Sequence, residues 1–207
     1  MKILFIATLL AVTSAAAAET QANSQTVLIT GANRGIGFEF VRQLSARDWR
    51  IIATTRRPDQ ATELQALAAR DPDVRVEYLD VTDHPGIDEL AEKYRDQPID
   101  ILLLNAAMGP TPQTAGRRLA KLDFDVARQS FEVNSIGPMK VAQAFMPNVQ
   151  ASNRKLVLAM SSDSGSFVAG SKVAALYHYK ASKAALNMYF HTLHFETRRQ
   201  GVTAVML

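Results

Sequence analysis

The stretch QTVLITGANRGIG, residues 25–37, decides the fold of this chain. Its first half, residues 25–30, is a run of apolar and β-branched side chains that predicts a buried strand. The glycines after it predict a tight turn that opens into a helix. Gly31, Gly35 and Gly37 are spaced so that backbone amides and a helix N-terminus can approach a pyrophosphate closely. The alternative is a turn that only joins a strand to a helix, but its place at the first strand-to-helix junction favours a dinucleotide site.

The alternation of strand and helix continues along the rest of the sequence. Strands are expected at 25–30, 50–55, 74–79, 99–104, 155–160 and 202–207, and helices at 36–46, 59–70, 86–96, 123–150 and 177–200. Asp83, two residues before Pro85, is a signal for the start of the third helix. Right-handed crossovers between parallel strands place helices on both faces of a sheet. The sequence therefore predicts a doubly wound α/β domain with three layers, α/β/α, which binds ligands beyond the carboxyl ends of its six strands.

Composition and the first residues bound the domain organisation. The chain has 207 residues, no cysteine and a formal charge of +3. Residues 1–18 run from a lysine through an apolar core to four alanines, which is typical of a secretory signal cleaved after Ala18; an uncleaved anchor is the alternative. Residues 19–207 are then enough for a single domain. We expect an exported, periplasmic or envelope-associated protein with no stable membrane span after signal removal, or a cytoplasmic one if the signal is not used.

Charge and cysteine content exclude other classes of protein. The positive charge is mild and scattered, so it gives no indication of nucleic-acid binding. Without cysteine the chain has no disulfide framework. His191 and His194 have a spacing that could serve a metal, but no third ligand is evident, so we expect a helix surface there and no metal.

Tyr179 and Lys183 carry the strongest indication of chemistry. Residues four apart lie on one face of a helix, so the ammonium can approach the phenol, favour its ionised form and make it a proton donor and acceptor. Only Tyr179, among five tyrosines, has a lysine four residues later. A half-buried tyrosine beside a solvated lysine would explain the pair equally well if it stood alone.

Together, the spacing Gly-x-x-x-Gly-x-Gly and the later Tyr-x-x-x-Lys resemble the short-chain dehydrogenase/reductase family from about residue 25 to 207. The segment YHYKASKAALNM, residues 177–188, is most similar to the C-factor-like subgroup. The resemblance implies a Rossmann fold that binds NAD(P) and an enzyme that transfers hydride between a nicotinamide and a carbonyl or alcohol substrate.

The resemblance also implies a catalytic set of Asn134, Ser162, Tyr179 and Lys183. Asn134 would hold a water that links Lys183 to a proton relay, and Ser162 would hydrogen-bond the substrate oxygen, with Ser161 and Ser164 as alternatives. Tyr179 would be the general acid and base. Lys183 would hold the nicotinamide ribose and bias the tyrosine.

A cofactor-binding set follows from the same resemblance, on the turns after the first four strands. It comprises Gly31, Asn33, Arg34, Gly35, Ile36, Gly37, Arg56, Asp80, Val81, Asn105 and Ala106, together with Tyr179 and Lys183. Arg34 and Arg56, with no acid at the end of the second strand, favour NADP; NAD is the alternative. Asp80 would contact adenine, or else form an Asx turn. The chain has Leu104-Asn105-Ala106-Ala107 where the family usually has Asn-Asn-Ala-Gly, which is a departure from the pattern.

Partners and activity are less constrained by the sequence. The resemblance implies a homodimer or homotetramer that uses the helices at 123–150 and 177–200. Family members usually continue past the sixth strand into a Pro-Gly turn, a substrate lid and a seventh strand, so the end at Leu207 suggests a truncated member with an uncovered edge. Two hypotheses therefore accompany the enzyme: a non-catalytic nucleotide-binding or C-factor-like signalling protein, and an inactive fragment.

Overall fold

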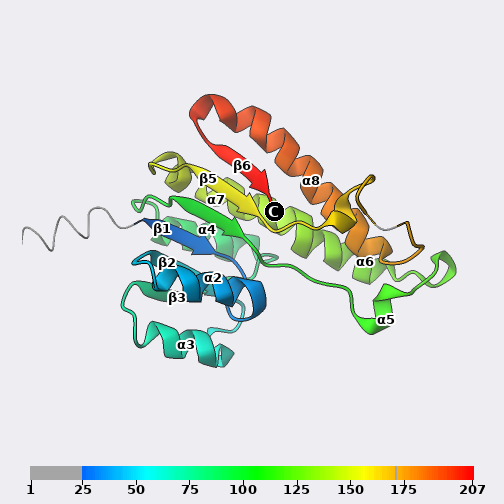
Figure 1. Cartoon of the computed structure of the whole chain (residues 1–207), viewed down its shortest axis with the longest axis horizontal. Helices are drawn as coiled ribbons and strands as arrows, with labels where there is room; N and C mark the ends of the chain where they lie inside the picture. Colours follow the sequence, from blue (N-terminus) through cyan, green and yellow to red (C-terminus); the bar gives the residue numbers. More distant parts are fainter. Residues whose placement is uncertain (1–24, 171) are drawn as a thin grey trace, which may run out of the picture.

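The computed structural model describes residues 25–170 and 172–207, so the predicted signal at 1–18 lies outside the described residues. Its sheet contains β1 (Thr26–Ile29), β2 (Arg50–Thr55), β3 (Val74–Tyr78), β4 (Ile101–Leu104), β5 (Leu156–Ala159) and β6 (Thr203–Met206). All pairings are parallel, in the order β3-β2-β1-β4-β5-β6 (Figure 1). This confirms the doubly wound prediction. The strand order changes direction between β1 and β4, which is where such sheets bind ligands.

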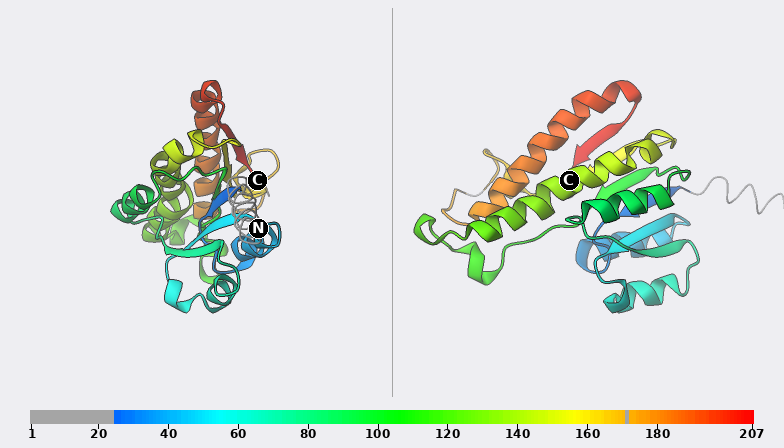
Figure 2. Two further views of the ribbon diagram at one scale, coloured as in Figure 1. Left: turned by 90° about the vertical axis from the view of Figure 1, so that its left-hand side faces the viewer. Right: turned by 180° about the vertical axis from the view of Figure 1, so that it is seen from behind.

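Helices cover both faces of the sheet (Figures 1 and 2). They are α2 (Gly35–Ser45), α3 (Thr62–Ala68), α4 (His84–Lys93), α5 (Pro112–Ala115), α6 (Phe124–Phe131), α7 (Gly137–Gln150) and α8 (Tyr177–Thr197). Side chains alternate along β1, so Val27 packs with α2 and α3 on one face, while Leu28 packs with α4, α7 and α8 on the other. Within the described residues, no helix is both long and apolar enough to cross a membrane.

The largest difference from the sequence prediction is in the helix expected at 123–150. It consists of α6, a π-helical turn at Glu132–Ile136, and α7. Pro138 gives a physical reason, because it has no N–H and cannot make the usual helical hydrogen bond to the carbonyl of Asn134. Such π-helical turns are frequent at functional sites. The helix start predicted at Asp83 is confirmed, since its side chain accepts a 3.2 Å hydrogen bond from the Gly86 amide.

Among the described strands, β6 lies at one edge of the sheet and pairs only with β5. Val205, Met206 and Leu207 are 36%, 40% and 55% exposed, so this edge carries apolar surface. An unpaired edge of this kind is a place where another chain can add.

Candidate active site

The glycine turn after β1 is shaped by two close approaches. A Cβ on Gly31 would lie 2.9 Å from the Ala106 Cα, and one on Gly37 would lie 2.3 Å from the Gly31 carbonyl oxygen. Gly31 and Gly35 also have φ of +68° and +57°, in the left-handed region that favours glycine. A Cβ on Gly35 would meet nothing within 4 Å, so the backbone there is open.

This turn leads directly into the N-terminus of α2. The N-cap residue, Arg34, makes no side-chain cap, and the first turn carries no acidic residue. The first amides of a helix need acceptors, and the helix dipole favours an anion there. An open glycine backbone beside uncapped amides fits the pyrophosphate of a dinucleotide.

Asn105 ties this turn to the end of β4. Its side-chain amide donates to the carbonyls of Thr30 and Gly31 at 3.0 and 3.1 Å. The Thr30 hydroxyl in turn accepts from the amides of Asn105 and Ala106, both at 3.0 Å. Asn105 therefore holds the loops after β1 and β4 together, and Ala106 is the surface against which Gly31 packs.

A cleft of about 890 Å³ opens at the carboxyl ends of these strands. It gathers most of the predicted cofactor set: Gly31, Asn33, Arg34, Gly35, Arg56, Asp80, Val81, Asn105 and Ala106. Further lining residues were not predicted, among them Thr55, Arg57, Gln60, Met108, Gly109, Thr111, Gln129 and Val133. Arg57 could have been predicted as a lining residue, because it follows the predicted Arg56 directly in the sequence. Ile36 is 60% exposed and, like Gly37, does not line this cleft.

Asp80 forms an Asx turn and also lines the cleft. Its Oδ1 accepts from the Thr82 amide at 2.9 Å and from the Thr82 hydroxyl at 2.8 Å, which is the Asx turn considered as the alternative. The same residue lines the cleft. The turn fixes the carboxylate in place at the cleft wall.

Lys183 lies on the same face of α8 as Tyr179, as their spacing predicts. Its side chain is buried, and the residue is only 2% exposed. The ammonium donates to the Met160 carbonyl at the end of β5 at 2.7 Å and lies 5.9 Å from the centre of the Tyr179 ring. Burial lowers the pKa of Lys183 to about 8. A buried ammonium near the phenol is the arrangement that a tyrosine acid and base requires.

The lowered pKa of Lys183 makes stability depend on pH in a definite direction. Below pH 8 the lysine is charged in both the folded and the unfolded chain, so the cost of its burial is fully present. Between about 8 and the ordinary value of 10.5, the unfolded chain holds a proton that the folded chain has released. The free energy of unfolding therefore rises with pH there, by at most about 1.4 kcal/mol per pH unit. We expect urea unfolding to show wild type gaining stability relative to Lys183→Met across this window; a constant difference would contradict the lowered pKa.

Asn134 lies in the π-helical turn and is fully buried. Its Oδ1 accepts from the Met108 amide at 2.7 Å, and its Nδ2 donates to the Met108 carbonyl and the Ser182 hydroxyl, both at 3.0 Å. Ser182 then donates to the Tyr179 carbonyl at 2.9 Å. The side chain thus fixes the loop after β4 against α8, while its backbone carbonyl receives no hydrogen bond from Pro138.

The three candidate serines after β5 are held differently: Ser161 bonds α8, whereas Ser162 and Ser164 both donate to Asp163 Oδ1. Ser161 donates to Asn187 Oδ1 on α8 at 2.5 Å, so its hydroxyl is used in packing the strand end against the helix. Ser162 donates to Asp163 Oδ1 and accepts from the Ser164 amide, both at 3.1 Å. The bond to Asp163 is exposed to solvent. Ser162 therefore remains the predicted substrate contact, with Ser164 as the alternative.

The four predicted catalytic residues lie outside the lining of the cleft, but one of them, Tyr179, lines a cavity that shares residues with it. Met108 and Gly109 line both the cleft and a much smaller cavity whose wall includes Tyr179. Met108 is also the residue held by Asn134. The loop after β4 therefore lies between the cleft and the cavity beside Tyr179, and Asn134 holds it in place.

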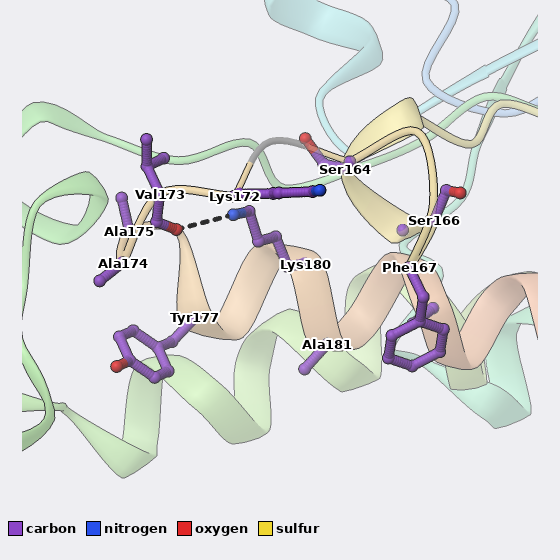
Figure 3. A pocket seen from close by; sticks show the side chains of 13 residues that line it. Ser164, Ser166, Phe167, Lys172, Val173, Ala174, Ala175, Tyr177, Lys180 and Ala181 are labelled. Carbon is purple, nitrogen blue, oxygen red and sulfur yellow. Dashed lines mark hydrogen bonds between the residues drawn. The ribbon is translucent and has the colours of Figure 1, made fainter.

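Another cavity, of about 560 Å³, lies between the loop after β5 and the first turns of α8 (Figure 3). Tyr177, Lys180 and Ala181 face it from the helix, and Lys180 donates to the Val173 carbonyl at 3.0 Å. At 3.6 residues per turn, these positions lie on the side of α8 roughly opposite to Tyr179 and Lys183. Of the candidate site residues, only the alternative serine, Ser164, lines this cavity.

Comparisons with known proteins agree with this geometry. The family model described as short chain dehydrogenase matches residues 25–207. An uncharacterized oxidoreductase of Schizosaccharomyces pombe is 30% identical over 182 residues, covering 86% of this chain and 70% of that protein. The carbonyl reductase Sniffer of D. melanogaster has a TM-score of 0.81 at 25% identity, covering 89% of this chain and 79% of that one. The NADPH-bound carbonyl reductase from chicken fatty liver has a TM-score of 0.78 at 29% identity, covering 88% and 74%.

Proposed function

We propose, from the premise that this chain belongs to the short-chain dehydrogenase family, that it is an NADP(H)-dependent oxidoreductase interconverting a carbonyl compound and an alcohol. The observation that carries the proposal is the buried Lys183 ammonium, 5.9 Å from the ring of Tyr179, whose cavity shares Met108 and Gly109 with the cleft at the glycine turn. Similarity to carbonyl reductases supports the same reaction class.

The cofactor would be held by the glycine turn and the amides of α2 at its pyrophosphate and by Lys183 at the nicotinamide ribose; when bound, it supplies the hydride. Ser162 and Tyr179 donate hydrogen bonds to the substrate oxygen as negative charge develops on it. Tyr179 then delivers its proton to that oxygen. The Lys183 ammonium stabilises the resulting phenolate, and a water on the Asn134 carbonyl, to which Pro138 cannot donate, returns the proton. Alcohol oxidation reverses these steps.

The preference for NADP is supported by the cations of the cleft. Arg34, Arg56 and Arg57 all line it, and all three are exposed. Planar guanidinium groups bind phosphate through two parallel hydrogen bonds, and a 2′-phosphate is what distinguishes NADP from NAD. In the similar chicken carbonyl reductase the bound nucleotide is NADPH.

Arg56→Asp is expected to raise the Kd for NADPH by about 10- to 100-fold, because the new carboxylate repels the 2′-phosphate. The Kd for NADH should stay the same or fall, because the carboxylate can accept a hydrogen bond from the ribose 2′-hydroxyl. Fluorescence titration of both nucleotides measures this. Arg70→Asp makes the same charge change at an exposed residue just after α3, outside the cleft. Equal losses of NADPH affinity in the two variants would contradict a specific contact.

The function itself is tested with the purified chain. NADPH and NADH are titrated by fluorescence, and NADPH oxidation is then followed with a panel of aldehydes and ketones. Turnover of any panel member supports the oxidoreductase. Binding without turnover favours the non-catalytic nucleotide-binding or signalling protein, and failure to bind either nucleotide sinks every cofactor-based function.

Two further proposals concern assembly and location. Met188 and Phe195 on α8 and Phe124 on α6 are 64%, 49% and 65% exposed, which supports a homodimer or homotetramer formed through these helices; light scattering would detect it.

The order of charge, apolar core and alanines in residues 1–18 supports export. An intact N-terminus on the chain from fractionated cells would contradict cleavage after Ala18.

A further inference from the structure

His178, the residue before Tyr179, has a polar atom without a partner. Its Nε2 is buried and makes no hydrogen bond with any of the described residues. The position is in the first turn of α8, which follows Leu176 in a left-handed conformation with φ of 61°. Buried polar atoms in native proteins are nearly always satisfied, and the exceptions commonly mark a bound water or ion.

A cavity of the size of one water lies beside this residue. Its volume is about 20 Å³, and its wall includes His178, Tyr179, Ser130 and Met108. A water needs at least about 10–15 Å³ and two to four polar partners. No carboxylate or second imidazole lines the cavity, so a metal ion would have no ligand set there.

Ser130 supplies a second partner for such a water. It is only 4% exposed, and its hydroxyl donates to the Val126 carbonyl one turn earlier in α6 at 2.7 Å. Because its single hydrogen is used in that bond, the Ser130 oxygen is left as an acceptor. A water can donate to it and bond His178 Nε2 with its remaining groups, whichever ring nitrogen carries the proton.

We propose that His178 and Ser130 hold one water in this cavity, and that His178 is thereby a positioning residue for the Tyr179 phenol. This proposal rests on the proposed function of Tyr179. Tyr179 lines the same cavity, and Met108 and Gly109 connect it to the cofactor cleft. The water thus lies on the α6 side of the tyrosine and restricts how far the phenol can move from its reacting position. The Lys183 ammonium, also on α8, lies 5.9 Å from the centre of the same ring.

The test compares His178→Gln with His178→Met, two side chains of similar length that differ in whether they end in a polar group. We expect kcat for a carbonyl substrate to fall about tenfold in the Met variant and to stay within about threefold of wild type in the Gln variant, a difference of the size of one ordered hydrogen bond. The Kd for NADPH should be unchanged in both. Equal losses of kcat in the two variants would mean that His178 only fills space, and would overturn the proposal.

High-resolution crystal structures give a readout that does not depend on turnover. Wild type should show a water bonded to His178 Nε2 and Ser130 Oγ, and the Met variant should lose that water and show a displaced or split Tyr179 side chain. Absence of the water in wild type, or an unmoved Tyr179 in the Met variant, would overturn the proposal. A wild-type chain that holds the water but turns over no carbonyl would instead overturn the proposed function.

Discussion

Tyr179→Phe is expected to lower kcat by about 10²- to 10⁴-fold, the usual contribution of a positioned general acid or base. The substitution removes one hydroxyl and keeps the ring that lies 5.9 Å from the Lys183 ammonium. The cleft is lined by other residues, so NADPH should bind within about threefold of wild type. Single-turnover measurements with saturating NADPH separate the chemical step from nucleotide binding.

Tyr177→Phe is the matched control. Tyr177 lies two residues earlier on α8, is 40% exposed and faces the cavity on the other side of the helix (Figure 3). It undergoes the same loss of a hydroxyl without touching the proposed site, so its kcat should match wild type. A full rate in Tyr179→Phe, or a comparable loss in Tyr177→Phe, would show that Tyr179 is not the proton donor.

The fold was largely predictable because its signals are local. The inner strands β1, β2, β4 and β5 are short, largely buried runs, and β2 has the bounds that the sequence predicts, 50–55. Helix starts depend on nearby side chains, as at Asp83. The sequence did not predict the π-helical turn, because its cause is a single proline inside an otherwise regular helical pattern. Hydrophobic periodicity does not distinguish backbone hydrogen bonds that span five residues from those that span four.

Many residues of the candidate site were predictable from spacing and family resemblance, but the contacts between distant residues were not. Helical spacing predicts that Tyr179 and Lys183 share a face of α8. The bond from Asn134 to Ser182 joins residues 48 apart, and those from Asn134 to Met108 join residues 26 apart. No local pattern specifies such contacts. For the same reason, the buried nitrogen of His178 and the place of Arg57 in the cleft became visible only in three dimensions.

Gly37→Ala is expected to destabilise the fold by about 3 kcal/mol, as overpacking of a tight contact does, and to weaken NADPH binding more than about tenfold. Gly37 lies inside α2, where alanine would ordinarily stabilise a helix by up to about 1 kcal/mol. The close contacts outweigh that gain. The added Cβ would lie 2.3 Å from the Gly31 oxygen and 2.5 Å from Asn105 Nδ2, so the turn and the amide that clamps it must both move.

Alanine substitutions at two other glycines serve as controls that distinguish the effect of a close contact from the effect of backbone strain. Gly116 is exposed, has φ of −94° and would place a Cβ in open space, so Gly116→Ala should leave urea unfolding and NADPH titration unchanged. A Cβ on Gly35 also meets nothing within 4 Å, but φ there is +57°, so Gly35→Ala should cost only about 1–2 kcal/mol. The expected order of stability is therefore Gly116→Ala, then Gly35→Ala, then Gly37→Ala. If Gly37→Ala proved as stable as Gly116→Ala, the tight junction between the turn, Asn105 and α2 would not be what holds this site in shape.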